Sequence, residues 1–255
     1  MPRFPKESSL SSFGEQMSSR WPWAGSGHGP LPILLVLLTV VTGIVDAVSY
    51  IALGHVFVAN MTGNVVFLGF ALAGASGLSV PASLTALGAF LLGALTGGRI
   101  AVVFADHRGR HLRTATARAI VPVLLAVILA AILDQPVSQS ARYLLIVPLA
   151  FAMGIQNATA RALAVPDLTT TVLTLTLTGI AADSRFAHGP GAHAARRLIS
   201  VSAMFAGALI GGLLAINVDL LLPLALAAVL MASSAVLAHR LSIGGHDWVK
   251  PPGHG

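Results

Sequence analysis

The sequence predicts an all-α protein that crosses a membrane several times, and three observations support this fold class. Of its 255 residues, 55% are hydrophobic and only 9% are charged, whereas about a quarter of the residues in soluble domains are charged. Apolar stretches of roughly 20 residues, the length needed to cross a bilayer, recur between Leu31 and Leu241. The pattern of these stretches also occurs twice along the chain.

Three motifs of the first half return in the same order in the second half. The pairs are 43–47 with 154–158, 58–65 with 165–172, and 93–98 with 207–212. Duplicated membrane halves are typical of solute transporters, which bind their solute where the halves meet. The duplication therefore favours transport, although it identifies no substrate.

Composition and the repeat divide the chain into four parts. Residues 1–29 are rich in Ser, Pro and Gly and are expected to form a disordered tail. The first membrane repeat covers 30–134 and the second covers 135–241. Residues 242–255 are expected to form a flexible C-terminal tail.

Eight apolar segments can be delimited, and the distribution of charge indicates how many of them cross the membrane. The segments cover about 31–53, 55–75, 80–104, 118–134, 142–164, 168–182, 197–217 and 219–240. Basic residues collect in both tails and after the third and sixth segments, and such regions stay on the cytoplasmic side. Eight crossings would place some of them outside, so one segment in each half is expected not to cross.

The second and sixth segments are the ones expected not to cross. Each opens with a polar, helix-breaking stretch, Asn60–Asn64 in one half and Pro166–Thr171 in the other. If they are broken or re-entrant, six spans remain as inverted 3+3 repeats with both termini in the cytoplasm. Non-helical backbone at membrane depth must be buried in protein or line a watery cavity. The alternative is that both segments are short but ordinary spans.

Asp46 is the most informative single residue because it lies within the first span, with apolar sequence on both sides. A carboxylate at the bilayer centre costs about 3 kcal/mol or more, so such residues usually face a partner, a cavity or a proton path. Its counterpart in the repeat is Asn157, which has the same shape without the charge. Two interpretations stay open: cation or proton coupling or substrate contact, and a purely structural carboxylate.

Polar groups at the two breaks complete the candidate substrate or ion site. Asn60, Thr62 and Asn64 open the second segment, where the N-terminus of a half-helix would suit an anionic or carbonyl-bearing solute. Capping of that half-helix by Thr62 or Asn64 is the alternative. In the second half the candidates are Asp167, Thr171 and Thr174. Threonine hydroxyls in membrane helices often bond their own backbone, so a threonine-lined path is the less favoured interpretation there.

Two pairs of glycines, at a spacing of four residues, predict close helix packing. They are Gly93 with Gly97 and Gly207 with Gly211. Small residues at this spacing allow helix backbones to approach closely in membranes. We expect these contacts to lie between the two halves.

Several classes of function have no support in the sequence. The chain has no cysteine, which excludes disulfides, iron–sulfur clusters and thiolate zinc sites. No nucleophile–base pair, phosphate-binding loop or metal-ligand spacing is visible, so we expect no enzyme, no cofactor and no metal. The net charge of +6 follows from basic cytoplasmic loops and does not indicate nucleic-acid binding.

The stretch Gly43–Tyr50, followed by Val56–Asn64, resembles the YoaK family of small bacterial membrane proteins. The resemblance covers about residues 31–240. It implies a multi-pass protein of the bacterial cytoplasmic membrane. Because the family has no assigned function, the resemblance transfers no binding residues.

The leading hypothesis is therefore a secondary transporter or channel for a small solute or ion. Its expected partners are the lipid bilayer and that solute, and a homo-oligomer is compatible with the sequence. The alternative is a non-transporting assembly or sensor protein that binds a partner through its glycine-rich helix faces. An intramembrane enzyme is a third and weaker hypothesis.

Overall fold

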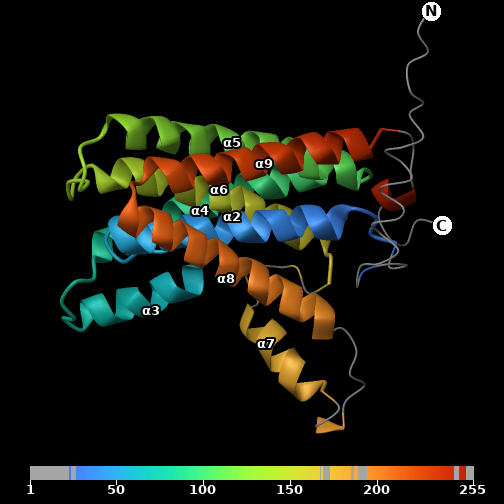
Figure 1. The fold of residues 1–255 in the computed structure, drawn as a ribbon, viewed down its shortest axis with the longest axis horizontal. Helices are drawn as coiled ribbons and strands as arrows, with labels where there is room; N and C mark the ends of the chain where they lie inside the picture. The colour runs from blue at the N-terminus through green and yellow to red at the C-terminus, as the bar shows by residue number, and fades with distance from the viewer. Residues whose placement is uncertain are drawn as a thin grey trace, which may run out of the picture.

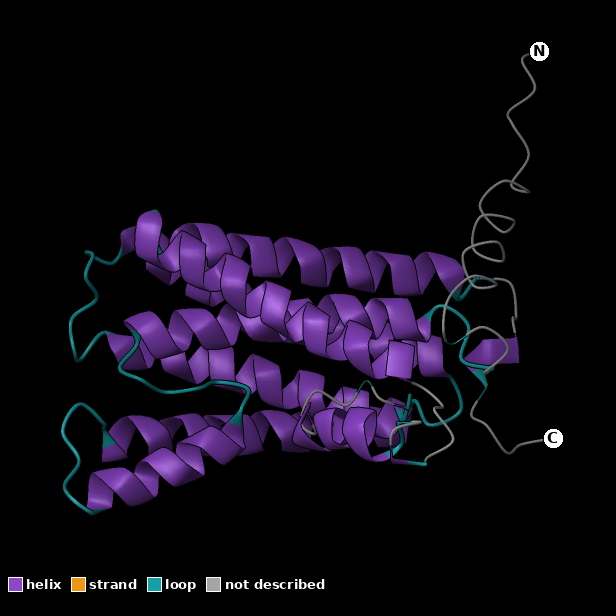
Figure 2. Cartoon of the chain, turned by 60° about the horizontal axis from the view of Figure 1, so that its bottom comes forward, coloured by secondary structure: helices purple, strands orange, loops and turns teal. Residues whose placement is uncertain are grey.

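The computed structural model describes residues 23, 27–166, 168, 173–184, 187–188, 194–243 and 247–250. In this part of the chain every regular element is a helix, as Figure 2 shows. Six helices are long and apolar enough to cross a membrane, and two shorter apolar helices accompany them. The predicted all-α polytopic fold with six spans and two short segments is confirmed.

The helices follow the predicted segments closely. The six long helices are α2 (Leu31–Ala52), α4 (Val80–Val103), α5 (Arg108–Ile132), α6 (Arg142–Leu163), α8 (Ala194–Asn217) and α9 (Leu221–Leu241). The short helices are α3 (Met61–Leu72) and α7 (Leu173–Ala182), and a 3-10 turn, η3, covers Asp247–Val249. With 12 and 10 residues, α3 and α7 are well below the roughly 20 residues needed to cross a bilayer.

Two boundaries differ clearly from the prediction. Helix α3 begins at Met61 rather than near 55, and α5 begins at Arg108 rather than near 118. The predicted basic loop is in fact the start of this helix. The backbone amide of Arg110 donates to Nδ1 of His107, which occupies the N-cap position, over 3.1 Å. Hydropathy marks only the apolar part of a helix, so these polar first turns were missed.

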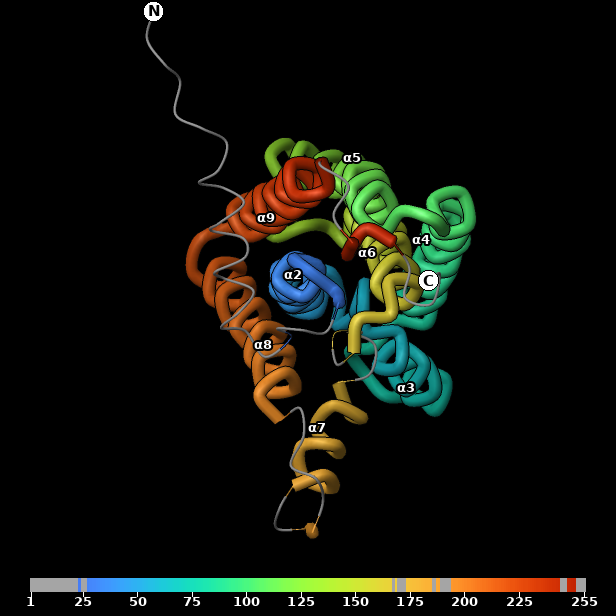
Figure 3. The backbone as a smooth tube through the Cα atoms, turned by 90° about the vertical axis from the view of Figure 1, so that its right-hand side faces the viewer, coloured from blue at the N-terminus to red at the C-terminus, as the bar shows by residue number. Residues whose placement is uncertain are grey.

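Two helices, α2 and α6, form the centre of the bundle. In the most apolar 18-residue stretch of each helix, 72% is buried in α2 and in α6, but only 28% is buried in α4 and in α8. Figure 3 shows α2 enclosed by its neighbours. Helix α2 packs mainly against α8 and α9, whereas α6 packs mainly against α4 and α5. The first helix of each half is therefore surrounded by helices of the other half.

The long helices alternate in direction and define two ends of the bundle. Helix α2 begins and α9 ends at the same end in Figure 1, which we call the terminal end. Helix α6 runs opposite to α2, starting at the far end. Helix ends at the terminal end carry Arg99, Arg108, Arg110, Arg113, Arg161, Arg196, Arg197 and Arg240. The far end carries Arg142, Asp134 and Asp219, so basic residues concentrate at the terminal end.

Glycines bring α2 and α8 into backbone contact. A Cβ added to Gly43 would lie 2.6 Å from the backbone N of Ala208, and one on Gly211 would lie 2.7 Å from Cα of Ile44. A Cβ on Gly207 would collide with the carbonyl oxygen of Val40. These helices can approach so closely only because no side chain stands between them.

The contact between α4 and α6 repeats this arrangement with the corresponding glycines. A Cβ on Gly154 would lie 2.7 Å from the backbone N of Ala94, and one on Gly97 would lie 2.8 Å from the carbonyl oxygen of Ile155. A Cβ on Gly93 would collide with the carbonyl oxygen of Phe151. All four glycines of the two predicted pairs therefore lie at contacts between the halves.

Residues next to the termini pack against the terminal end of the bundle. The buried side chain of Trp23 donates from Nε1 to the carbonyl oxygen of Pro166 over 3.2 Å. The guanidinium of Arg108 donates to the carbonyl oxygen of Leu163 over 2.6 Å and lies 3.0 Å from Nδ1 of His28. In the C-terminal segment, the 3-10 turn η3 contacts α5, so parts of both segments predicted as tails contact the bundle.

The contact between His28 and Arg108 predicts a pH-dependent stability. Burial, followed by the positive charges of Arg108 and Arg196, lowers the pKa of His28 below its ordinary value of 6.5. As the pH falls, His28 therefore takes up a proton at a higher pH in the unfolded chain than in the folded protein. The stabilising contribution of His28 is therefore complete above about pH 6.5 and is lost progressively below it.

We expect the melting temperature of the purified protein to fall as the pH is lowered below about 6.5. The matched variant His28→Gln can still accept from Arg108 but does not titrate, so its melting temperature should depend less on pH. Some dependence should persist, since burial also lowers the pKa of His107. An identical pH dependence in wild type and His28→Gln would contradict the prediction.

Candidate functional site

The chain between α2 and α3 turns back towards the middle of the bundle. The turn uses Gly54 and His55, whose φ angles are 97° and 57°. Positive φ costs glycine little and is less unfavourable for His than for most residues. The following residues, 56–60, form no helix and lead into α3. The predicted break was Asn60–Asn64, whereas residues 61–64 are the first turn of α3 and the non-helical backbone lies just before it. We call residues 56–60 the break.

Asp46 holds the break through backbone hydrogen bonds. Its Oδ1 accepts from the amides of Val58 and Ala59, over 3.0 and 2.8 Å, and the residue is only 3% exposed. The amide of Asn60 also faces this carboxyl. Successive amides aimed at one oxygen form the concave arrangement that binds anions in many proteins. The other oxygen, Oδ2, has no hydrogen-bond partner among the described residues.

Asn64 pairs the backbone groups of Phe57 in the break. It is completely buried, its Oδ1 accepts from the amide of Phe57 over 2.8 Å, and its Nδ2 donates to the carbonyl of Phe57 over 2.6 Å. Together with Asp46, it pairs four backbone groups that no helix satisfies. Such pairing is required where irregular backbone lies at membrane depth.

The other two candidates of the first break have different positions. Helix α3 begins at Met61, and the side chain of Asn60 at its N-cap position makes no capping hydrogen bond. The capping alternative for Thr62 and Asn64 is therefore wrong, because both residues lie inside the helix. Asn60 and Thr62 are exposed beside a helix N-terminus that lacks a side-chain cap.

The second break is only partly described. Asp167 and Thr171 lie outside the described residues, and Thr174 is an exposed residue of α7. In this helix the buried threonine is Thr176, which the sequence pattern did not single out. Asn157, the counterpart of Asp46, is buried on α6 and donates from Nδ2 to the carbonyl of Met153 over 3.0 Å.

Gln156 is a central polar residue that sequence reasoning missed. Its Nε2 donates to the carbonyl of Leu38 over 3.0 Å and to the hydroxyl of Thr42 over 2.8 Å. It therefore joins α6 to α2 at the centre of the bundle. Its Oε1 has no hydrogen-bond partner among the described residues. An amide pair, Gln156 with Asn157, inside an apolar span was the signal that could have identified it.

Replacing Gln156 with leucine should have a small effect. The carbonyl of Leu38 and the hydroxyl of Thr42 also bond to each other over 3.0 Å, so neither loses its only partner. Interhelical hydrogen bonds in membranes contribute about 0.6 kcal/mol on average, and we expect a loss near 1 kcal/mol, measured as a fall in melting temperature. Asn217→Leu is the control, because Asn217 is exposed and bonds only within α8. A loss several times larger than 1 kcal/mol would contradict this reading.

Aromatic rings cover the break on the side of the far end. Tyr50 stacks on Phe57 with ring centroids 5.1 Å apart, and Phe57 stacks on Phe67 at 5.7 Å. His55 meets the edge of Tyr50 at 5.2 Å. A Cβ on Gly63 would lie 2.7 Å from the ring of Phe57, so the small residue here makes room for the cluster.

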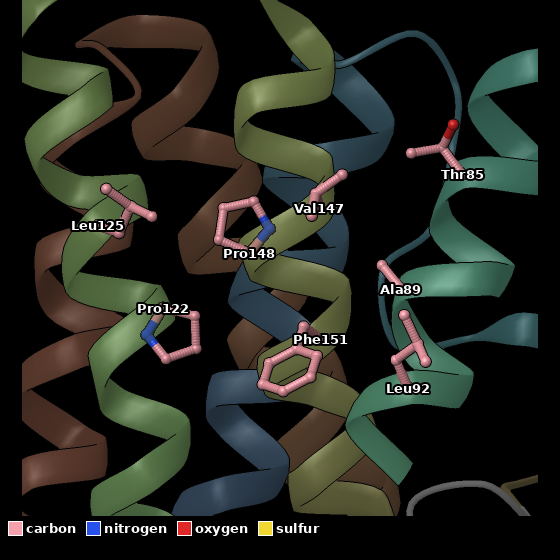
Figure 4. Close-up of a pocket in the computed structure, with 8 residues that line it drawn as sticks. All are labelled: Thr85, Ala89, Leu92, Pro122, Leu125, Val147, Pro148 and Phe151. Carbon is pink, nitrogen blue, oxygen red and sulfur yellow. The ribbon is translucent and has the colours of Figure 1, made fainter. Parts of the chain in front are cut away.

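A groove of about 430 Å³ opens on the side of the bundle between α4, α5 and α6. Figure 4 shows its lining, which is Thr85, Ala89, Leu92, Pro122, Leu125, Val147, Pro148 and Phe151. All but one of these side chains are apolar. The groove suits hydrocarbon rather than a polar solute, so the candidate site is the break beside Asp46.

Among the described residues no three His, Cys, Asp or Glu side chains form a group that could hold a metal ion. The chemistry available at the break is therefore that of one carboxyl, a run of backbone amides and a few neutral polar side chains. Such a set can bind a proton, or a solute that presents hydrogen-bonding groups.

Comparisons with known proteins agree with a membrane protein. A family model described as a protein of unknown function, DUF1275, matches residues 34–237. A UPF0700 transmembrane protein, YoaK, from Bacillus subtilis (strain 168) is 36% identical over 151 residues, which are 59% of this chain and 65% of that protein. The match thus covers slightly less than two thirds of the relative. No solved structure matches the chain. This integral membrane protein belongs to the DUF1275 family.

Proposed function

We propose that this protein is a secondary transporter that moves a small solute or ion by alternating access between two inverted halves. The observation that carries the proposal is the break beside Asp46, where non-helical backbone is held inside the bundle by buried polar side chains. Transporters place their solute sites at such interrupted helices near the membrane midplane.

The packing of the halves supports this proposal. Helix α2 packs on α8 and α6 packs on α4, using corresponding glycines, while α2 and α6 run in opposite directions. Each half also has one short helix that contacts the following long helix, α3 on α4 and α7 on α8. A pair of equivalent, oppositely oriented halves provides two equivalent states, one open to each side.

The arrangement of charge supports an orientation. With most basic residues at the terminal end, the positive-inside rule places that end in the cytoplasm. Both termini then lie in the cytoplasm of a bacterial cell, and the far end of the bundle faces the outside.

The alternative of a partner-binding protein has less support. It required glycine-rich helix faces that are free to bind another protein. Gly93, Gly97, Gly207 and Gly211 are instead covered by helices of the same chain.

Single cysteines test the proposed movement directly, because the natural chain has none. We would place cysteines at Asn60 and Thr174, both exposed, one beside each break. A membrane-impermeant maleimide should reach Asn60→Cys from outside and Thr174→Cys from the cytoplasmic side. Ser76→Cys and Arg110→Cys are accessible controls for the two ends, and Leu91→Cys, on the apolar face of α4, should stay unlabelled.

The double variant distinguishes alternating access from a fixed structure. Labelling Asn60→Cys from outside should hold the protein open on that side and slow the labelling of Thr174→Cys from the cytoplasm. A panel of amino acids, small anions and small cations, applied to proteoliposomes on a solid-supported membrane, then screens for the solute. Independent labelling of both positions, with no current for any member of the panel, would contradict the proposal.

A further inference from the structure

We infer that the ion bound by Asp46 is a proton and not a metal cation, so that Asp46 is the proton-binding residue of the transport cycle. This inference rests on the proposed function and names its coupling ion. The proton would add to the free Oδ2 when the carboxylate becomes a neutral carboxylic acid. Water on the open side supplies this proton and receives it again.

The surroundings of Oδ1 exclude a metal cation there. Both hydrogen-bond partners of this oxygen are N–H donors, from Val58 and Ala59. The N-terminus of α3, which begins two residues later, adds the positive end of a helix dipole. Sodium and other hard cations need several oxygen ligands, whereas these groups present hydrogens.

The burial of Oδ2 favours a proton over a larger ion. Asp46 is 3% exposed, and Oδ2 has no hydrogen-bond partner in the described part of the chain. Among the residues that the structure describes, the hydrogen bonds of the Asp46 carboxyl come from backbone amides, and no charged side chain forms an ion pair with it. A permanent, unpaired negative charge at this depth is costly, and a reversible proton removes that cost while Oδ1 keeps both amides.

The other titratable groups on the packed elements lie towards the ends of the helices. On α8, α9 and α6 those near the terminal end are Arg161, Arg196, Arg197, His239 and Arg240. Those near the far end are Tyr50, His55, Arg142, Tyr143 and Asp219. Tyr50 stands one helical turn after Asp46, on the same face of α2, and its ring meets the exposed His55. These two residues are the described titratable groups nearest to Asp46 along the chain.

Asn157, the counterpart of Asp46 in the repeat, indicates that asparagine is the suitable replacement for Asp46. Asn157 occupies the corresponding position of the second half, so asparagine is compatible with this place in the fold. In Asp46→Asn the amide oxygen can accept from Val58 and Ala59 as the carboxylate does. The variant therefore removes the proton site with little change to the hydrogen bonds that hold the break.

Infrared spectroscopy of the purified, lipid-reconstituted full chain tests the inference without a known solute. Between about pH 6 and pH 9 exposed carboxyl groups stay ionised, so a carbonyl band that grows as the pH falls reports a buried carboxyl. We expect such a band in wild type, loss of the band in Asp46→Asn, and an unchanged band in His55→Ala. Asp46→Glu keeps a carboxyl and should retain a titrating band at a shifted frequency.

Two results would overturn the inference. One is a spectrum in this pH range with no band that depends on Asp46, or with a band that does not change with pH. The other is a band, or a melting temperature, that changes when sodium replaces choline at constant pH. A titrating Asp46 in a protein whose two breaks label independently would preserve proton binding and refute transport, so the two proposals can fail separately.

Discussion

Replacing Gly207 with alanine is expected to produce one of the largest losses of stability that a single added methyl group can cause at a described glycine of this bundle. The new Cβ would collide with the carbonyl oxygen of Val40 and lie 3.0 Å from its Cα. Backbone atoms cannot rotate away, so α2 and α8 would have to separate along their contact. Overpacking of this kind costs about 1–3 kcal/mol, and sometimes more. The measurement is the melting temperature of the purified protein, followed by tryptophan fluorescence.

Gly98 provides the matched control on another helix of the same kind. A Cβ at Gly98 has no atom within 4 Å, and alanine is more favourable than glycine inside a helix by about 0.5–1 kcal/mol. Gly98→Ala should therefore leave the melting temperature unchanged or raise it. Gly93→Ala, which would collide with Phe151 in the corresponding contact, should behave like Gly207→Ala. Equal effects at Gly98 and Gly207 would refute the proposed close contact.

The second large effect is expected for Asp46→Ala. This change removes the acceptor for the amides of Val58 and Ala59 and leaves two buried N–H groups without a partner. Each unsatisfied buried donor costs about 1–3 kcal/mol. We expect a loss of several kcal/mol, seen as a lower melting temperature and as faster amide hydrogen exchange at Val58 and Ala59.

Two further variants separate the hydrogen bonds of Asp46 from its charge. Asp46→Asn keeps an acceptor oxygen and should lose much less stability than Asp46→Ala. Asp134→Ala removes an exposed carboxylate near the far end and should have no measurable effect. If Asp46→Asn and Asp46→Ala are equally unstable, the charge itself holds the break, and the amide hydrogen bonds are secondary.

The sequence was sufficient to predict the number of spans and the two short segments. Apolar length identified the long helices. The arginines predicted that one segment in each half does not cross, and the polar stretches predicted which segment it is. The start of α5 was missed because Arg108 and Arg110 belong to a helix that extends beyond its apolar part. Hydropathy shows which residues are apolar, and it carries no information on how far a helix continues into water.

The details of the site were less predictable, for a physical reason. The sequence identified Asp46 and Asn64 as unusual residues at a break, but it could not show that their partners are backbone groups of residues 57–59. Backbone partners leave no trace in side-chain identity. Gly43 and Gly154 were both visible in the repeated motif. Their packing role could not be predicted, because it depends on which helices meet in the fold.

The exchange of first helices between the halves has a consequence for how the protein is made. Helix α2 is synthesised long before α8, on which Gly43 packs. The face of α2 that carries Gly43 is therefore exposed to lipid until the chain is almost complete. Neither half contains the neighbours that its own first helix needs. Two fragments divided between α5 and α6 should each be short-lived when expressed alone and should protect each other from proteolysis when expressed together. The first half of this protein is therefore not expected to form a stable structure before the second half is synthesised.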